Sequence, residues 1–377
     1  MNTDADEARL TRALAQLLAR FPAPADADRQ DFLRARYDLG LAWVQFEPGS
    51  GGLDVSASLQ RLVEERLRPL GAPTPGSGDY VGMHQVAASI NAVGTDEQRA
   101  RFLPAIFVGT ENWCQLFSEP GAGSDLAGLA TMAVRDGDEW VVHGQKVWTS
   151  GARDARWAIL VARTDPDVPK HRGLTFFVCD MELPGIEIRP LRQADGARHF
   201  NEVFLDGVRL PDQLRLGDVG QGWAVSLAGL NSEREGIGEA IGSPIGDVLE
   251  AWARYDAPSP AIAAVQRQRV AAAWIDAKLL DLGAAAHGSL QKVARGQANQ
   301  RMSSLLVDLL GPAGQIGFDY DADADPPPPM QVVRSRANSI EGGTDEIQRN
   351  IIGEQILGLP GDVRVDKNLP WRDIPRS

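Results

Sequence analysis

The sequence has few residues that could build disulfides or metal sites. Its 377 residues include only two cysteines, Cys114 and Cys179, and five histidines, with no H-x-x-x-H or C-x-x-C spacing. We therefore expect neither a disulfide framework nor a structural metal. So few cysteines fit a reducing compartment, and we expect a cytoplasmic protein.

Long apolar runs and a positive charge excess are also lacking. Apolar runs are short, such as WAILVA at 157–162, whereas a membrane span needs roughly 18 residues. The acidic start MNTDADEARL has no apolar segment of the kind found in secretory signals. The net charge of −13 argues against nucleic acid as a partner, because phosphate binding relies on Lys and Arg.

Three regions with different hydrophobic patterns predict an α+β multidomain fold. In residues 1–112, Leu10, Leu14 and Leu17 recur at helical spacing, which predicts an N-terminal α-helical domain. Residues 113–218 contain short β-rich segments, the first two joined by the turn RDGD, and predict a small antiparallel β domain. Residues 219–377 return to helical patterns and predict a second helical domain.

The helical patterns of the third region have predicted limits. Three segments cover about 222–254, 261–295 and 297–310, and a proline-rich loop follows at 321–330. A last helix is predicted to begin near Thr344 and to end at Gly358.

Two glycines mark the first stretch that could bind a ligand, LFSEPGAGSDLAG at 116–128. Gly121 and Gly123 let main chain approach a ligand closely, and Ser118 and Ser124 offer hydroxyls. A dinucleotide fingerprint would need a third glycine where Leu126 stands, so a nicotinamide site is not predicted. Taken alone, this stretch is better explained as a surface turn.

A tryptophan followed by two hydroxyls ends the predicted strand in GQKVWTSGA, residues 144–152. Trp148, Thr149 and Ser150 suit a planar heterocycle, because they combine a flat aromatic with short hydrogen-bonding groups. The alternative is a core tryptophan with satisfied neighbours.

A glutamate lies on an apolar helix stripe in AGLNSEREGIGEAIG, residues 228–242. Glu233 shares its side with Leu230, Ile237 and Ile241. Desolvation there favours the protonated carboxyl unless it is paired, and such a group suits proton abstraction from carbon. The alternative is a salt bridge, for instance with Arg234.

The stretch NSIEGGTDEIQRN, residues 338–350, combines an acid, two glycines and a helix start. Glu341 precedes Gly342 and Gly343, and Thr344 is a good N-cap. Free N–H groups at such a start can hold a phosphate, although the same residues also suit a capped helix that holds nothing.

Together these stretches, in this order, resemble the acyl-CoA dehydrogenase family. FSEPGAGSD, GQKVWTSG and GGTDEIQRNIIGEQILG are close to family signatures, and the helical, β, helical order agrees. The resemblance implies a C-terminal four-helix bundle, FAD as cofactor and an acyl-CoA thioester as substrate. A glutamate would remove the α proton and flavin N5 would take the β hydride, giving a trans-2-enoyl-CoA. Electrons would then pass to an electron-transfer flavoprotein or a similar acceptor.

The resemblance also implies roles for individual residues. Expected flavin contacts are Gln115, Leu116, Phe117, Ser118, Gly123, Trp148, Thr149, Ser150, Gln268, Thr344 and Glu346. Expected substrate contacts are Ser124, Asn231, Arg234 and Gly342, with the Gly342 N–H donating to the thioester oxygen.

The family places its base in one of two positions, and the sequence favours the rarer one. Most members carry glutamate immediately before the Gly-Thr pair, but here that residue is Gly342 and Glu341 is one place too early. A minority carry the base on the earlier helix, directly before an arginine, as in Glu233-Arg234. We therefore predict Glu233 as the base, with Glu341 as second choice.

The half-site that one subunit offers to its neighbour's FAD departs from the family pattern. Gln268 matches, but Ala257 stands where arginine is expected and Asp308 where glutamine is expected. Such a pattern resembles heteromeric bacterial members, heterotetramers that act on bulky acyl groups such as sterol side chains. We expect a catalytic subunit with a second family-like chain, or else a homotetramer or homodimer.

Three alternatives use the same fold. The chain could be a non-catalytic partner subunit, an acyl-CoA oxidase or a dehydrogenase of carrier-protein thioesters.

Overall fold

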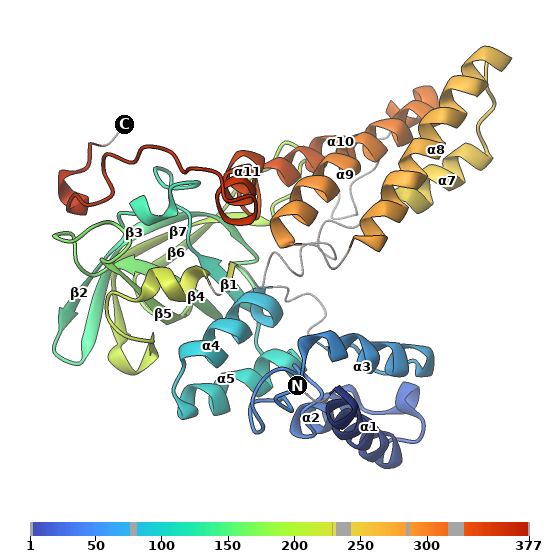
Figure 1. Cartoon of the computed structure of the whole chain (residues 1–377). Helices are drawn as coiled ribbons and strands as arrows, with labels where there is room; N and C mark the ends of the chain where they lie inside the picture. Colours follow the sequence, from blue (N-terminus) through green and yellow to red (C-terminus); the bar gives the residue numbers. More distant parts are fainter. Residues whose placement is uncertain are drawn as a thin grey trace.

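The chain folds into a helical part, a β-sheet part and a second helical part, in that order (Figure 1). A computed structural model describes residues 3–75, 81–227, 229–230, 243–283, 287–315 and 328–375. The predicted fold class is confirmed by this order of elements. The domain limits at 112/113 and 218/219 remain predictions.

The N-terminal part packs around the leucines expected to face its core. Leu10, Leu14 and Leu17 of α1 are buried. Thr95 caps α5, and Gln98 returns the hydrogen bond to the Thr95 N–H, which completes the capping box. The helices are α1 (Thr3–Arg20), α2 (Arg29–Asp38), α3 (Gln60–Leu67), the π-helical η4 (Val81–Val86), α4 (Ala87–Val93) and α5 (Asp96–Val108).

One eight-stranded sheet forms the middle part, with strand order β6-β7-β3-β2-β4-β5-β8 and β1 beside β4. Its pairings are antiparallel as predicted, except that β4 runs parallel to β1 and to β2. The strands are β1 (Trp113–Leu116), β2 (Met132–Asp136), β3 (Glu139–Ser150), β4 (Trp157–Arg163), β5 (Leu174–Asp180), β6 (Ile186–Pro190), β7 (Phe200–Pro211) and β8 (Arg215–Leu216).

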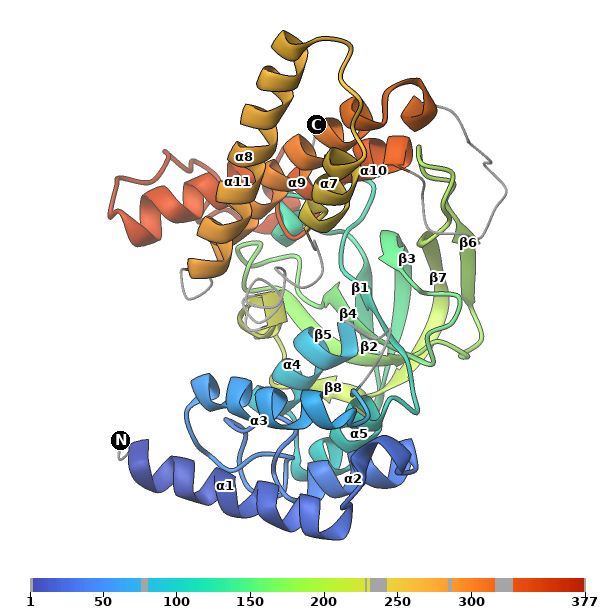
Figure 2. The same ribbon diagram turned by 90° about the vertical axis from the view of Figure 1, so that its right-hand side faces the viewer.

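In the C-terminal part, α7, α8 and α10 pack against α9 (Figure 2). The helices are α7 (Ile245–Ala253), α8 (Pro260–Leu282), α9 (Gly288–Leu310), α10 (Pro328–Ser335) and α11 (Asp345–Ile351), which continues as a π-helix over Ile352–Ile356. The last helical segment thus begins after Thr344 and ends before Gly358, as predicted.

Two helix limits predicted for this part are wrong. The expected segment 222–254 is interrupted at Ser243 and Pro244, because a proline disfavours helix at the residue before it. The expected helices 261–295 and 297–310 are divided near Gly283 instead, and α9 runs through Gly296. Gly296 serves close packing, since a Cβ there would lie 3.2 Å from the Asn338 carbonyl oxygen.

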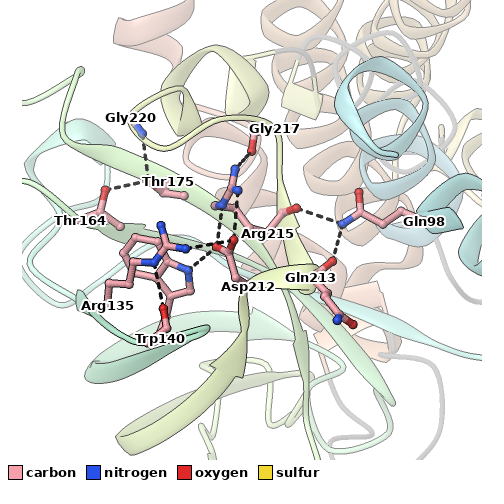
Figure 3. A network of polar contacts seen from close by, with 11 residues as sticks. Gln98, Arg135, Trp140, Thr164, Thr175, Asp212, Gln213, Arg215, Gly217 and Gly220 are labelled. Carbon is pink, nitrogen blue, oxygen red and sulfur yellow. Dashed lines mark hydrogen bonds and ion pairs between the residues drawn. The ribbon is translucent and has the colours of Figure 1, made fainter. Parts of the chain in front are cut away.

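A polar network fixes the connection from the sheet to the second helical part (Figure 3). Gln98 of α5 donates to the carbonyls of Gln213 (2.8 Å) and Arg215 (3.0 Å). Asp212 accepts hydrogen bonds from Arg215 (2.8 Å) and Trp140 (2.7 Å), which lower the pKa of its carboxyl to about 2. The network therefore joins α5, the sheet and the chain leading to the helical residues 222–227.

Candidate active site

A fully buried ammonium group organises the loop after β1. Lys146 of β3 donates to the Phe117 carbonyl (3.0 Å), the Val161 carbonyl (2.9 Å) and the Glu119 carboxylate (2.8 Å). All three donors of this side chain are thus used, and the loop is fixed to two strands.

The carboxylate of Glu119 anchors the other end of the same loop. It accepts hydrogen bonds from the N–H groups of Ala130 (2.6 Å) and Thr131 (2.9 Å). Burial alone would raise the pKa of Glu119, but the Lys146 charge and these hydrogen bonds hold it below its usual value. Burial lowers the pKa of Lys146, and Glu119 opposes that effect. Lys146 and Glu119 therefore form a buried ion pair in which both charged groups are hydrogen-bonded.

Only part of the segment Gln115–Ser118 can offer side chains to a ligand. Leu116 and Phe117 are buried, and the Phe117 ring packs edge-on against Phe176. Gln115 and Ser118 are half-buried. Any flavin contact of Leu116 or Phe117 would therefore be made by main chain.

The glycines of this loop face open space. A Cβ added at Gly121 or Gly123 would meet no protein atom within 4 Å among the residues the structure describes. Ser124 beside them is exposed. Their main chain is thus accessible to a ligand, while Glu119 and Lys146 hold the loop that carries them.

Trp148 occupies a strained position next to the same loop. It lies in an irregularity of the β3–β7 pairing with φ of 61°, a left-handed conformation that is rare for a bulky residue. Its side chain is 60% exposed, so the prediction's alternative of a core tryptophan is wrong. The neighbouring Val147 N–H donates to the Ser118 carbonyl (2.9 Å), which brings the first two predicted ligand stretches together.

The two hydroxyls after Trp148 lie in different surroundings. Thr149 is buried, and its Oγ1 has no hydrogen-bond partner among the described residues. Ser150 is exposed at the end of β3, and Gly151 after it has open space where a Cβ would stand. An exposed aromatic face, an unpaired buried hydroxyl and accessible main chain together fit a flat cofactor with polar edges.

The loop 338–345 is fastened to α9. Lys292 and Asp345 form a buried ion pair (2.9 Å), and Asn299 donates to Asn338 (2.7 Å). Gly342 and Gly343 have φ of 65° and 86°, which favours glycine at both positions. Gln348 donates to the Gly342 carbonyl (2.8 Å), so the main chain just after the Gly342 N–H is fixed.

Thr344 and Glu346 differ in how they could meet a ligand. The Thr344 hydroxyl accepts from the Ile347 N–H (3.2 Å), as expected for an N-cap. Glu346 is exposed and lies 3.8 Å from Arg349.

Glu341 is already engaged by its neighbours. Its two carboxylate oxygens accept hydrogen bonds from the two terminal nitrogens of Arg334. Asn338 donates a further hydrogen bond to Glu341 Oε1 (2.7 Å). A carboxylate held in this way is poorly placed to take a proton from a substrate.

Comparison with known proteins agrees with this arrangement. Family models of the acyl-CoA dehydrogenase N-terminal, middle and C-terminal domains match residues 6–110, 114–208 and 261–357. Acyl-CoA dehydrogenase IpdE1 of Mycobacterium tuberculosis is 35% identical, over 86% of this chain and 85% of its own length. The chain belongs to the acyl-CoA dehydrogenase family.

Two further comparisons concern the length and the fold of this chain. Acyl-CoA dehydrogenase FadE34 of M. tuberculosis is 36% identical over 94% of this chain, which spans about half of FadE34 (49%). The structure of the Tcur3481–Tcur3483 steroid ACAD covers 96% of this chain and 99% of its own, at 26% identity and a TM-score of 0.72.

The structure does not describe three of the residues for which the family resemblance implies a role. Glu233, Asn231 and Arg234 lie outside the described residues. Residues 222–227 and 229–230 are helical and lead toward them. Gln268 is exposed on α8, and Asp308 of α9 pairs with Arg269 (2.7 Å). Asp308, which stands where glutamine is expected, is thus paired with a cation of its own chain.

Lys146 and Glu119 are functional neighbours that the sequence analysis did not predict. Both are charged residues inside otherwise ligand-like motifs. Charges that must be buried are paired, so an acid and a base in two adjacent motifs could have predicted the contact.

The described part of the chain shows neither a metal-binding cluster nor a membrane-spanning helix. No group of three or more His, Cys, Asp or Glu there could hold a metal ion. No helix there is long and apolar enough to span a membrane.

Proposed function

We propose that this chain is the catalytic subunit of an FAD-dependent acyl-CoA dehydrogenase that converts an acyl-CoA thioester to the trans-2-enoyl-CoA. The observation that carries the proposal is the junction of the Gln115–Ser118 segment with Trp148 through the Val147–Ser118 hydrogen bond. A subunit kept only for packing would have no need of a strained, exposed tryptophan beside an accessible glycine loop.

The chain's own groups fit the cofactor. Trp148 and Ser150 would lie at the flavin ring, and Gln115 and Ser118 at its polar edge. Main chain at Gly123, and residues Thr344 and Glu346, would approach the phosphates or adenosine. FAD, when bound, accepts a hydride from the β carbon of the substrate.

Glu233 is proposed to take the α proton. Gly342 stands where most family members carry the base, and Glu341 is occupied by Arg334 and Asn338. The Gly342 N–H would donate to the thioester oxygen, where negative charge develops as the proton leaves. Asn231, Arg234 and Ser124 are proposed to hold the coenzyme A portion.

A second family-like chain is proposed to complete the flavin site. The half-site offered to a neighbour lacks its arginine at Ala257, and Asp308 is tied to Arg269. One face of α8 exposes Val265, Ile275 and Leu279 around Gln268, and a contiguous exposed apolar face marks an interface. A steroid-type acyl group is proposed because the Tcur3481–Tcur3483 structure carries that name.

The proposal is tested by expressing the chain alone and with a neighbouring family-like chain. We expect FAD to be retained by the pair, and anaerobic addition of a steroid-side-chain acyl-CoA to bleach the flavin and give a product lighter by two hydrogens. No bleaching by any acyl-CoA would contradict the dehydrogenase assignment. One FAD per subunit in the chain alone would contradict the need for a partner.

The same preparation separates a dehydrogenase from an oxidase. We expect the reduced flavin to pass electrons to an electron-transfer flavoprotein or an artificial acceptor. Stoichiometric peroxide in air would instead identify an oxidase, and activity confined to carrier-protein thioesters would identify the third alternative.

A further inference from the structure

Two buried side-chain oxygens on one helix, Gln85 Oε1 and Ser89 Oγ, have no hydrogen-bond partner in the part of the fold that the structure describes. Gln85, in the π-helical turn η4, is 2% exposed, and Ser89, one turn later in α4, is fully buried. Neither Gln85 Oε1 nor Ser89 Oγ makes a hydrogen bond to a described residue. An unpaired buried polar atom is costly and therefore rare, so each needs an explanation.

Most neighbouring positions of the same helical segment are apolar. Val86 and Ile90 of the same helical segment are fully buried, and Met83 and Leu230 pack against the same core. A π-helical turn inside an α-helix is itself a feature that recurs at functional sites. The two unpaired oxygens thus lie at buried positions where apolar side chains would give a more stable protein.

The pair lies near two elements of the proposed active site. Gly229, in the helical residues 229–230, is so close that a Cβ there would lie 2.9 Å from Ser89 Oγ and 3.5 Å from the Gln85 carbonyl oxygen. Gly229 precedes Glu233 by four residues in the sequence. The η4 turn also packs against β1, which carries Gln115.

We propose that Gln85 and Ser89 bind an oxygen atom of the acyl group, so that the enzyme selects thioesters whose acyl portion bears a hydroxyl or keto group. The inference rests on the proposed function and specifies its substrate. The Ser89 hydroxyl can donate to a keto oxygen, and Gln85 Oε1 can accept from a hydroxyl group, so the pair complements either group. A plain hydrocarbon acyl group would leave both unpaired, and sites of this kind discriminate strongly against the analogue that lacks the polar group.

The test uses three thioesters that share one skeleton: cyclohexylpropanoyl-CoA and its hydroxyl and keto counterparts, with oxygen on the ring carbon farthest from the chain. The FAD-loaded complex is mixed with each one, and anaerobic flavin reduction gives kcat/KM. We expect the oxygenated thioesters to be preferred by about tenfold to a hundredfold. Ser89→Ala and Gln85→Met should remove most of that preference, because they should lower kcat/KM much more for the oxygenated thioesters than for the plain one.

Ser226→Ala is the matched control, because Ser226 is a buried serine on the adjacent helical segment whose hydroxyl already donates to the Gly222 carbonyl (2.7 Å). It should leave the preference unchanged. Binding is read separately from the shift in Tm that each thioester causes, in wild type and in the three variants.

The outcomes distinguish this inference from the function on which it rests. Reduction by all three thioesters without preference for oxygen, or equal losses on all three in Ser89→Ala and Gln85→Met, would overturn the inference alone. The second result is what an ordered water bound to the pair would give. If no thioester reduces the flavin or shifts Tm, the proposed function and this inference both fail.

Discussion

Arg334 holds Glu341 through two hydrogen bonds, with its terminal nitrogens 3.2 and 2.9 Å from the two carboxylate oxygens. The acid that looks most prominent in the last motif is therefore a structural partner of α10. Its charge joins the end of α10 to the loop that presents Gly342.

Glu341→Gln is expected to lower the free energy of unfolding by about 0.5–1 kcal/mol, because the ion pair is about one-third exposed and well aligned. Chemical denaturation of the purified protein measures the change. Glu346→Gln is the control, since Glu346 is more exposed and its arginine is farther away. Equal stability of Glu341→Gln and wild type would show that the pair contributes nothing.

At position 148, glycine should give a more stable protein than alanine, which is the reverse of the usual order in a strand. At φ of 61° alanine is strained and glycine is not, so Trp148→Gly should be more stable than Trp148→Ala by about 1 kcal/mol without bound FAD. Both variants should bind FAD more weakly than wild type, because the flat ring is gone. Thermal unfolding and FAD titration measure the two effects.

Val134 on β2 provides the control for that comparison. It is similarly exposed but has no positive φ, so Val134→Gly should be less stable than Val134→Ala. The same order at both positions would contradict the account of Trp148.

Asp212 should make the connection to the second helical part sensitive to acid. The folded-state pKa is about 2 against an ordinary value of 3.8, so its contribution is fully present above about pH 4 and disappears as the pH falls toward 2. Asp212→Asn should cost about 1–2 kcal/mol at pH 7, and the difference from wild type should vanish near pH 2. Asp138→Asn, at an exposed site, should cost little at either pH. A difference that is independent of pH would contradict this assignment.

The exposed face of α8 should be a subunit interface. Val265→Asp and Leu279→Asp each place a charge on that face, where both side chains are 60% exposed, and should weaken assembly by about tenfold or more. Native mass and gel filtration of the chain, with its co-expressed partner, measure this. Val134→Asp should leave the mass unchanged, and unchanged mass in all three variants would exclude the α8 face.

Local signals predicted much of the fold. Leu10, Leu14 and Leu17 marked the buried side of α1, and Thr344 marked the start of α11, because periodicity and capping act over a few residues. The order of helical and β regions followed from the same kind of signal.

Contacts between distant segments were not predictable in this way. Lys146 forms a hydrogen bond with Glu119, which is 27 positions away in the sequence. Gly296 lies at a predicted helix boundary, but in the structure it allows close packing against Asn338. In the site, the role predicted for Gly342 stays a prediction, and only the structure shows that Arg334 pairs with Glu341.

The most direct test of the central claim is anaerobic flavin reduction by an acyl-CoA in Glu233→Gln and Glu341→Gln, followed by stopped-flow absorbance. Both variants are first shown to hold FAD as wild type does. We predict that Glu233→Gln slows reduction by about 10²–10⁴-fold, while Glu341→Gln reduces flavin at close to the wild-type rate. Reduction at the wild-type rate by Glu233→Gln, or loss of reduction only in Glu341→Gln, would contradict the account.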